Sequence, residues 1–177
     1  MSRYFRIFHR RVLPFLFPLI ALTALTGMIY RVGRAWFGMD RTTGDLVLNI
    51  HTGGWMGDGV SPFYVLLVGF SLLAALLTGG AYLVRKGGGG WLRRSHRLLG
   101  LVFLLPLLVT AGTGILFEAG ETWLHFPEST SKLLMTLHEG RWLGKGGRVY
   151  YVLVTGSALL GVGVIGLALW RSRKKAN

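Results

Sequence analysis

Long apolar stretches alternate with shorter polar ones along the whole chain. Four stretches of about 20 residues are almost free of charge: 12–30, 62–84, 98–117 and 149–170. At ~1.5 Å of rise per residue, a helix of that length spans the ~30 Å hydrocarbon core of a bilayer. The pattern therefore predicts four transmembrane helices. The first is interpreted as a helix and not as a signal peptide, because no small-residue cleavage site follows it convincingly.

The charged residues divide between the two ends of the predicted helices. Thirteen of the twenty basic residues flank one set of ends, and no acid lies among them. All seven acids fall in the segments 31–61 and 118–148. The positive-inside rule then places both termini in the cytoplasm and these two segments outside, which predicts a multi-pass protein of a bacterial cytoplasmic membrane. The net charge of +13 indicates contact with anionic lipid headgroups of the bilayer and no nucleic-acid partner.

The chain contains an internal repeat. Shifted by 87 positions, the sequence aligns with itself without a gap at residue types that composition alone would not match: His9-Arg10 with His96-Arg97, Thr26-Gly27 with Thr113-Gly114, and His51-x-Gly53-x-Trp55 with His138-x-Gly140-x-Trp142. The register defines two helix–loop–helix units, 1–86 and 87–177, within a single membrane domain, 1–177. We expect an all-α four-helix bundle with pseudo-twofold symmetry along the membrane normal. The glycine-rich segment 85–95 is predicted to be a flexible cytoplasmic turn between the units.

Four of the five histidines form two pairs that the repeat relates. His9 and His96 lie at the cytoplasmic ends of the first and third predicted helices. His51 and His138 end short apolar runs, which predict short helices or interfacial segments that carry both imidazoles to the outer mouth of the bundle. A twofold axis would set the members of each pair opposite one another, with one pair near each membrane surface. His125 has no histidine partner in the repeat and is assigned no role.

Facing imidazoles in a helix bundle are suited to bis-axial ligation of haem iron. The chain has no cysteine and hence no Cys-x-x-Cys-His motif, so the sequence predicts two non-covalent b haems held by the four paired histidines. Gly53 and Gly140 would let the backbone approach a porphyrin. Arg10 and Arg97 would pair with the propionates of the haem at the cytoplasmic side. Zinc is less suited, because it takes four clustered ligands.

The same residues have simpler interpretations. A histidine among arginines at a helix end is also a headgroup contact. The helix glycines serve close packing of helices or make room for a flat cofactor. The four tryptophans of the segments 31–61 and 118–148 are most simply interfacial anchors: Trp36, Trp55, Trp123 and Trp142. Stacking beside a haem is the alternative for Trp55 and Trp142.

The order of these motifs resembles the PepSY-associated transmembrane helix family. Members of that family begin a helix with His-Arg, end it near Thr-Gly, and continue with His-x-Gly before the next helix. The matching elements here occur twice and cover nearly the whole chain: His9-Arg10, Thr26-Gly27 and His51-x-Gly53, then His96-Arg97, Thr113-Gly114 and His138-x-Gly140. The family includes inner-membrane reductases of ferric siderophores with two b haems. The resemblance implies that His9, His96, His51 and His138 are haem ligands.

Two functions follow as hypotheses. The first is a di-haem b-type membrane cytochrome that transfers electrons from a quinol or a cytoplasmic reductase to an extracytoplasmic acceptor, ferric iron among the candidates. The outer segments have only about 30 residues, whereas larger relatives carry sizeable periplasmic PepSY domains, so a siderophore substrate does not follow. The second is a non-catalytic subunit that stabilises a larger membrane complex and binds lipid or pigment. Wide separation of the paired histidines would favour this second function.

Overall fold

The computed structural model describes residues 3–83 and 90–174, and within these ranges the chain forms helices and no strand. The α-helices are α1 (Arg3–Ile7), α2 (Leu13–Trp36), α3 (Arg41–Thr52), α4 (Ser61–Leu83), α5 (Trp91–Val102), α6 (Leu104–Ala119), α7 (Glu128–His138) and α8 (Gly144–Lys174). Short π-helical turns form η1 (Phe8–Val12) and η3 (Gly120–Leu124), and single 3₁₀ turns form η2 (Gly54–Met56) and η4 (Arg141–Leu143).

Four helical stretches of the described chain are long and apolar enough to cross a membrane: Phe8–Trp36, Ser61–Gly80, Leu104–Leu124 and Arg141–Ser172. They coincide with the four apolar stretches of the sequence, so the prediction of an all-helical protein with four long apolar helices is confirmed. The apolar runs before His51 and His138 also form helices, α3 and α7. The predicted turn 85–95 differs in part: residues 85–89 lie outside the described residues, and α5 already begins at Trp91.

The third apolar stretch is broken into two helices instead of one. The sequence predicted a continuous helix from residue 98, but α5 ends at Val102 and α6 starts at Leu104, with Phe103 between them. Pro106 explains the break, because it has no N–H to donate to the carbonyl of Val102 and its ring displaces that carbonyl. The break sets α5, which carries His96, apart from α6.

A second irregularity surrounds His9. The π-helical turn η1 precedes α2, and Pro14 is the second residue of α2. Pro14 cannot donate to the carbonyl of Arg10, four residues earlier, so regular α-helical pairing stops at this point. Single π-turns of this kind are frequent at functional sites.

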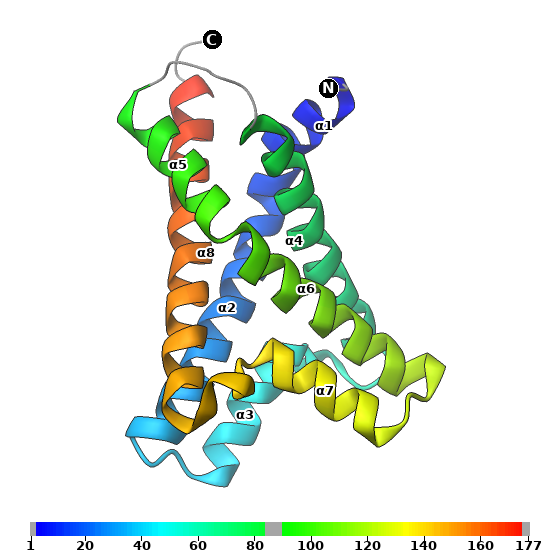
Figure 1. Cartoon of the computed structure of the whole chain (residues 1–177). Coiled ribbons are helices and arrows are strands. Elements are labelled where there is room, and N and C mark those ends of the chain that lie inside the picture. The colour runs from blue at the N-terminus through cyan, green and yellow to red at the C-terminus, as the bar shows by residue number, and fades with distance from the viewer. Residues whose placement is uncertain (1–2, 84–89, 175–177) are drawn as a thin grey trace.

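The long helices pack in two antiparallel pairs, α2 with α8 and α4 with α6, as Figure 1 shows. One buried cluster joins α4 to α6 and contains Leu72, Leu76, Leu107 and Ala111. Another joins α2 to α4 around Tyr64. The core therefore runs along the middle of the bundle, between the four long helices.

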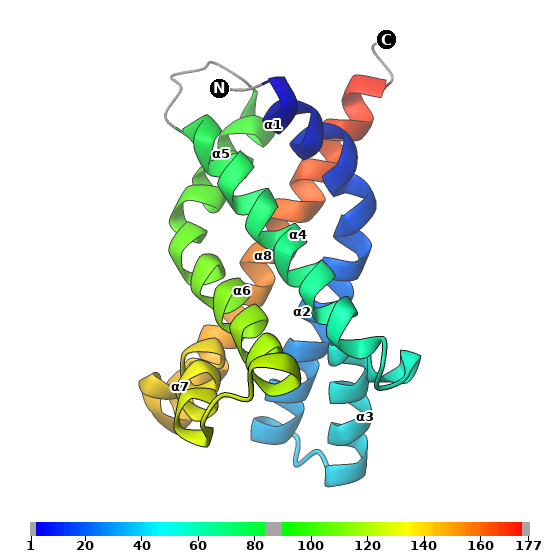
Figure 2. The ribbon, with the colours of Figure 1, turned by 90° about the vertical axis from the view of Figure 1, so that its right-hand side faces the viewer.

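The short helices lie at opposite ends of the bundle. The α1 helix, the start of α5 and the end of α8 lie at one end, whereas α3 and α7 lie at the other (Figures 1 and 2). The α3 helix packs on α2, and α7 packs on α6. We call the end with the first and last described residues the inner end, and the end with α3 and α7 the outer end.

Candidate functional site

His9 and His96 face each other at the inner end and form the inner pair. His9 lies in η1 and His96 in the middle of α5. Their ring centroids are 6.3 Å apart, with an angle of 74° between the ring planes. The packing of the bundle thus brings together two residues that are 87 positions apart in the sequence, as the repeat predicted.

A cavity of about 300 Å³ adjoins the inner pair. Its walls are mostly apolar and come from both ends of the sequence, with Phe17 and Leu72 on one side and Leu107 and Leu159 on another. Both inner histidines line it, and its basic lining residues are Arg10, Arg93 and Arg97. A largely apolar pocket with a few polar groups is the usual form of a cofactor site.

The inner imidazoles are held through their Nδ1 atoms. His96 Nδ1 lies 3.0 Å from the carbonyl of Val162 on α8, so it must be the donor. His9 Nδ1 lies 2.9 Å from the hydroxyl of Thr78 on α4. That hydroxyl gives its own hydrogen to the carbonyl of Ala74, so it accepts from His9. Both rings therefore carry the proton on Nδ1, and the lone pair that can bind a metal is on Nε2.

A glycine lies against each inner imidazole. A Cβ atom on Gly79 would stand 3.2 Å from His9 Cε1, and one on Gly166 would stand 3.1 Å from His96 Cε1. Both distances are shorter than most real Cβ contacts. The two glycines are 87 positions apart, so each half of the chain seats its inner histidine on a helix in the same way.

His51 and His138 form the outer pair, at the C-terminal ends of α3 and α7. His51 Nδ1 lies 2.9 Å from the carbonyl of Thr23 on α2, and His138 Nδ1 lies 2.9 Å from the carbonyl of Thr110 on α6. The hydroxyl of Thr26 is 3.2 Å from His51 Nδ1, and the equivalent hydroxyl in the second half is 3.4 Å from His138 Nδ1. The two outer histidines therefore make the same contacts in both halves, again with the lone pair on Nε2.

Glycines also seat the outer imidazoles. A Cβ atom on Gly27 would stand 3.0 Å from His51 Cε1, and one on Gly114 would stand 3.1 Å from His138 Cε1. Each glycine comes four residues after the threonine whose carbonyl accepts the bond. Because glycine has no side chain, the imidazole can reach the threonine carbonyl one helical turn earlier. The same four-residue spacing relates Val162 to Gly166 at the inner pair.

Both outer histidines are neutral at pH 7. Burial and, to a smaller extent, the charge of His138 lower the pKa of His51 to about 4. Burial also lowers the pKa of His138. The neutral form is the one that can bind a metal.

Gly53 and Gly140 have a local role that the sequence did not indicate. Both follow an outer helix with positive φ, 75° and 68°, which only glycine adopts without strain. A side chain on either would collide with the ring of Tyr64 or Tyr151. Each tyrosine hydroxyl in turn bonds a threonine of the neighbouring long helix, Thr23 or Thr110. The glycines thus fix the angle at which the outer histidines enter the bundle.

The other residues singled out in the sequence lie at the surface or the cavity edge. Arg10 and Arg97 both line the inner cavity. All four tryptophans are exposed, which fits interfacial anchors: Trp36, Trp55, Trp123 and Trp142. His125 is exposed and has a left-handed backbone at the end of η3.

The histidine pairs differ from a protein-only metal centre. Within the described residues, no group of three or more His, Cys, Asp or Glu side chains is placed to hold a metal ion. Two axial nitrogens suffice for haem iron, because the porphyrin supplies the other four ligands. The arrangement therefore fits a metal that brings its own equatorial ligands.

Comparison with known proteins gave no match: no protein-family model, curated protein or solved structure is significantly similar to this chain. The resemblance to the PepSY-associated family therefore stays a prediction from the motifs.

Several residues that contact the histidines were not predicted from the sequence. Thr78 was missed because its repeat equivalent is Ile165, so it left no duplicated signal. The carbonyls of Thr23, Thr110 and Val162 were missed because a backbone acceptor has no residue type. A usable signal did exist in the helix glycines that recur at the repeat offset, since all four that contact an imidazole belong to that set: Gly27, Gly114, Gly79 and Gly166.

Proposed function

We propose that this chain is a di-haem b-type membrane cytochrome, with one haem at each histidine pair. The observation that carries the proposal is the inner pair, in which two imidazoles that donate through Nδ1 face each other beside an apolar cavity of about 300 Å³. The ring centroids are 6.3 Å apart, so both imidazoles would be within reach of one cofactor bound between them.

The chain's own residues would supply position and electronic tuning. His9 and His96 would hold the inner haem, and His51 and His138 the outer one. The haem iron supplies one-electron redox chemistry when bound. Each Nδ1–H bond fixes the ring orientation and the tautomer, and it increases the basicity of the ligating nitrogen. Arg10 and Arg97 at the inner cavity are placed to balance propionate charge.

Lipid is the proposed surrounding of the bundle. Large apolar side chains on the long helices point away from the core and are well exposed, among them Phe15, Leu77, Leu105 and Val164. From His9 to Gly27, which touches His51, the chain runs 18 residues, or roughly 27 Å at ~1.5 Å per residue. This length is close to the ~30 Å hydrocarbon thickness, so the two sites would lie near opposite membrane faces.

The charge distribution supports an orientation with both termini in the cytoplasm of a bacterium. In that orientation His9 and His96 would hold a haem at the side where a quinol or a cytoplasmic reductase donates electrons. His51 and His138 would hold one at the side of an extracytoplasmic acceptor, with ferric iron as one candidate. We further propose that the two halves, 1–86 and 87–177, are tandem repeats related by a pseudo-twofold axis along the membrane normal. The matched contacts of the outer pair support this symmetry.

The alternative is a non-catalytic subunit of a larger membrane complex. It requires no contact between the paired histidines. The 6.3 Å separation of His9 and His96 and the matched seats of the outer pair support the cytochrome over this alternative.

A difference spectrum tests the proposal. The full chain is expressed with ample haem supply, purified in detergent, and reduced with dithionite. We expect a b-type α-band in the reduced-minus-oxidised spectrum and two haems per chain in a pyridine haemochromogen assay. Purified, folded protein without haem would contradict the proposal.

A further inference from the structure

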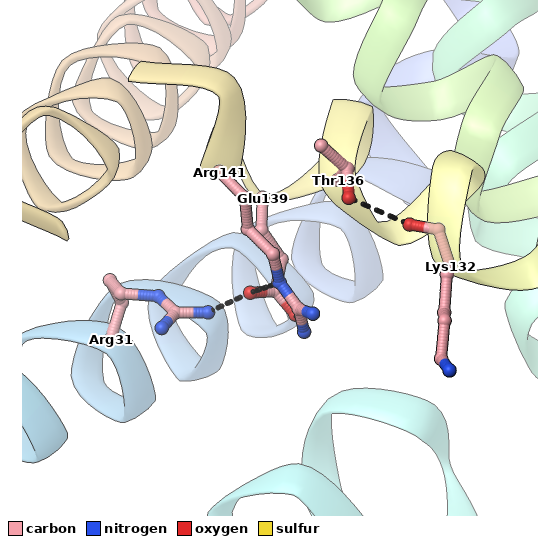
Figure 3. A network of polar contacts seen from close by, with 5 residues as sticks. All are labelled: Arg31, Lys132, Thr136, Glu139 and Arg141. Atoms are coloured by element: carbon pink, nitrogen blue, oxygen red, sulfur yellow. Dashed lines mark hydrogen bonds and ion pairs between the residues drawn. The ribbon is translucent and has the colours of Figure 1, made fainter. Parts of the chain in front are cut away.

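A cluster of three arginines and one glutamate lies at the outer end of the bundle. Arg31, near the end of α2, pairs with Glu139, which follows α7 (Figure 3). Arg141 donates to both carboxylate oxygens of Glu139, at 2.9 Å each. Arg148 of α8 is close enough to Arg31 for their charges to repel. We call these four residues the outer arginine cluster.

Two donors in this cluster have no acceptor. The Nε atoms of Arg31 and Arg148 are buried, and among the described residues they are the buried side-chain polar atoms that lack a hydrogen-bond partner. Arg31 as a whole is only 6% exposed. A buried guanidinium N–H without an acceptor destabilises the fold, because it has lost its hydrogen bond to water and gained none in return. The guanidinium has donors and no acceptor, so a missing partner must be an acceptor.

The cluster has more positive than negative charge. It contains three guanidinium groups and one carboxylate, and Glu139 is already bonded by Arg31 and Arg141. One carboxylate compensates the charge of one guanidinium only, and both of its oxygens are already bonded. The charge balance and the empty Nε donors both require an anion.

The cluster adjoins the outer histidine pair. Arg31 comes one helical turn after Gly27, which touches the ring of His51. Glu139 directly follows His138 and interacts with it electrostatically. An anion at the empty Nε donors would therefore lie at the outward side of the outer pair.

The repeat does not duplicate this cluster. The positions equivalent to Arg31 and Arg148 are Glu118 and Ser61, and those equivalent to Glu139 and Arg141 are Thr52 and Gly54. The histidines, glycines and threonines that seat the outer pair are duplicated. A planar ligand with one acidic edge would have two equivalent orientations between symmetric histidines, and the cluster removes that equivalence.

We infer that Arg31 and Arg148 form a carboxylate-binding site that takes a propionate of the outer haem and fixes which way that haem lies between His51 and His138. The inference rests on the proposed function for its ligand. The cluster itself is an oxyanion site whatever the source of the oxyanion, and a free phosphate or a lipid phosphate would meet the same donors.

Haem dimethyl ester, in which both propionates are esterified, tests this inference. The full chain with His9→Ala retains the outer site alone, and its haem-free form is titrated with haem and with the ester. Hydrogen bonds from charged groups predict at least about tenfold tighter binding of haem than of the ester. Arg148→Gln should remove this preference for haem, and Arg148→Lys should restore part of it. Arg148 is chosen over Arg31 because the loss of Arg31 would also break its ion pair with Glu139. Arg34→Gln is the matched control, because Arg34 lies on α2 but donates to the carbonyl of Met39.

The outcomes separate the inference from the proposed function. An outer site that binds haem and ester equally, or keeps its preference in Arg148→Gln, overturns the propionate assignment while the cytochrome stands. A chain that binds neither compound overturns the cytochrome and the propionate together. In that case thermal melting of the full chain with inorganic phosphate decides the oxyanion site. Stabilisation of the native chain but not of Arg148→Gln supports it, and equal melting temperatures overturn it.

Discussion

The two histidine pairs are held by the same kinds of contact, but the hydrogen-bond acceptors differ between them. In both, an imidazole donates through Nδ1 and packs on a helix glycine. At the outer pair the acceptor is the same backbone carbonyl in each half, that of Thr23 or Thr110. At the inner pair His96 uses a carbonyl, whereas His9 uses the hydroxyl of Thr78. Symmetry is thus kept where the backbone supplies the partner, and lost where a side chain does.

This difference has a consequence for tuning. A backbone carbonyl cannot be removed by substitution, so the two outer histidines share the same hydrogen bond. A hydroxyl can be removed by a single substitution, so the basicity of the His9 imidazole depends on residue 78. Three predictions test the comparison.

Loss of a ligand should give the largest effect. Replacing His51 or His138 by Ala removes one of two axial nitrogens, so each variant should contain one haem per chain instead of two, and both should lose the same haem. His9→Ala and His96→Ala should each remove the other one. The pyridine haemochromogen assay counts the haems, and a redox titration identifies which potential has disappeared.

His125→Ala is the control for these variants, because His125 is exposed and should leave both haems in place. If His51→Ala and His138→Ala each removed a different haem, the pairing across the bundle would be wrong.

Thr78→Val should give the next largest effect and only at the inner site. Valine keeps the shape of threonine but removes the acceptor from His9 Nδ1. Loss of such a partner typically costs about 10–100-fold in metal affinity. The less basic imidazole also favours the reduced iron, so the inner midpoint potential should rise. Thermal release of haem and a redox titration measure the two effects.

Two other threonines sharpen this prediction. Thr155→Val is the matched control, because Thr155 is equally buried but bonds only carbonyls of its own helix. Thr26→Val should have a smaller effect than Thr78→Val, since His51 keeps the Thr23 carbonyl at 2.9 Å. An effect of Thr26→Val as large as that of Thr78→Val would mean that the hydroxyls, and not the carbonyls, hold the outer pair.

A methyl group beside an imidazole should have the smallest effect. Gly114→Ala puts a Cβ atom 3.1 Å from His138 Cε1, whereas Gly112→Ala on the same helix meets nothing within 4 Å. Both substitutions favour the helix by about 1 kcal/mol. We expect Gly114→Ala to weaken outer haem binding by roughly tenfold, or about 1.4 kcal/mol, and Gly112→Ala to leave it unchanged. Equal haem affinities in the two variants would show that Gly114 serves helix packing alone.

The sequence predicted the parts of the structure that depend on residue type. Four long apolar helices follow from hydrophobicity, and the contact of His9 with His96 was expected from the repeat. The break at Phe103 was also predictable, because Pro106 follows it three residues later, but the apolar pattern around it hid the signal.

The acceptors of the imidazole N–H groups were not predictable from the sequence. Which carbonyl a histidine reaches depends on how two helices cross, and no residue type records that. The outer arginine cluster was hidden for a related reason. Its charged residues are far apart in sequence, from Arg31 to Arg148. In the charge pattern that predicts the topology, they look like any other charged residues of the outer segments.

Each half of the chain supplies one histidine to each pair and seats that histidine on its own helices. A half on its own would therefore have two prepared imidazoles and no complete site. Two separate halves would have to find each other in the membrane, and haem binding would then depend on protein concentration. Joining them in one chain makes the second imidazole an intramolecular partner at high effective concentration. A duplication followed by divergence would also explain why Arg31 in one half, and Arg141 and Arg148 in the other, have no arginine at the equivalent position.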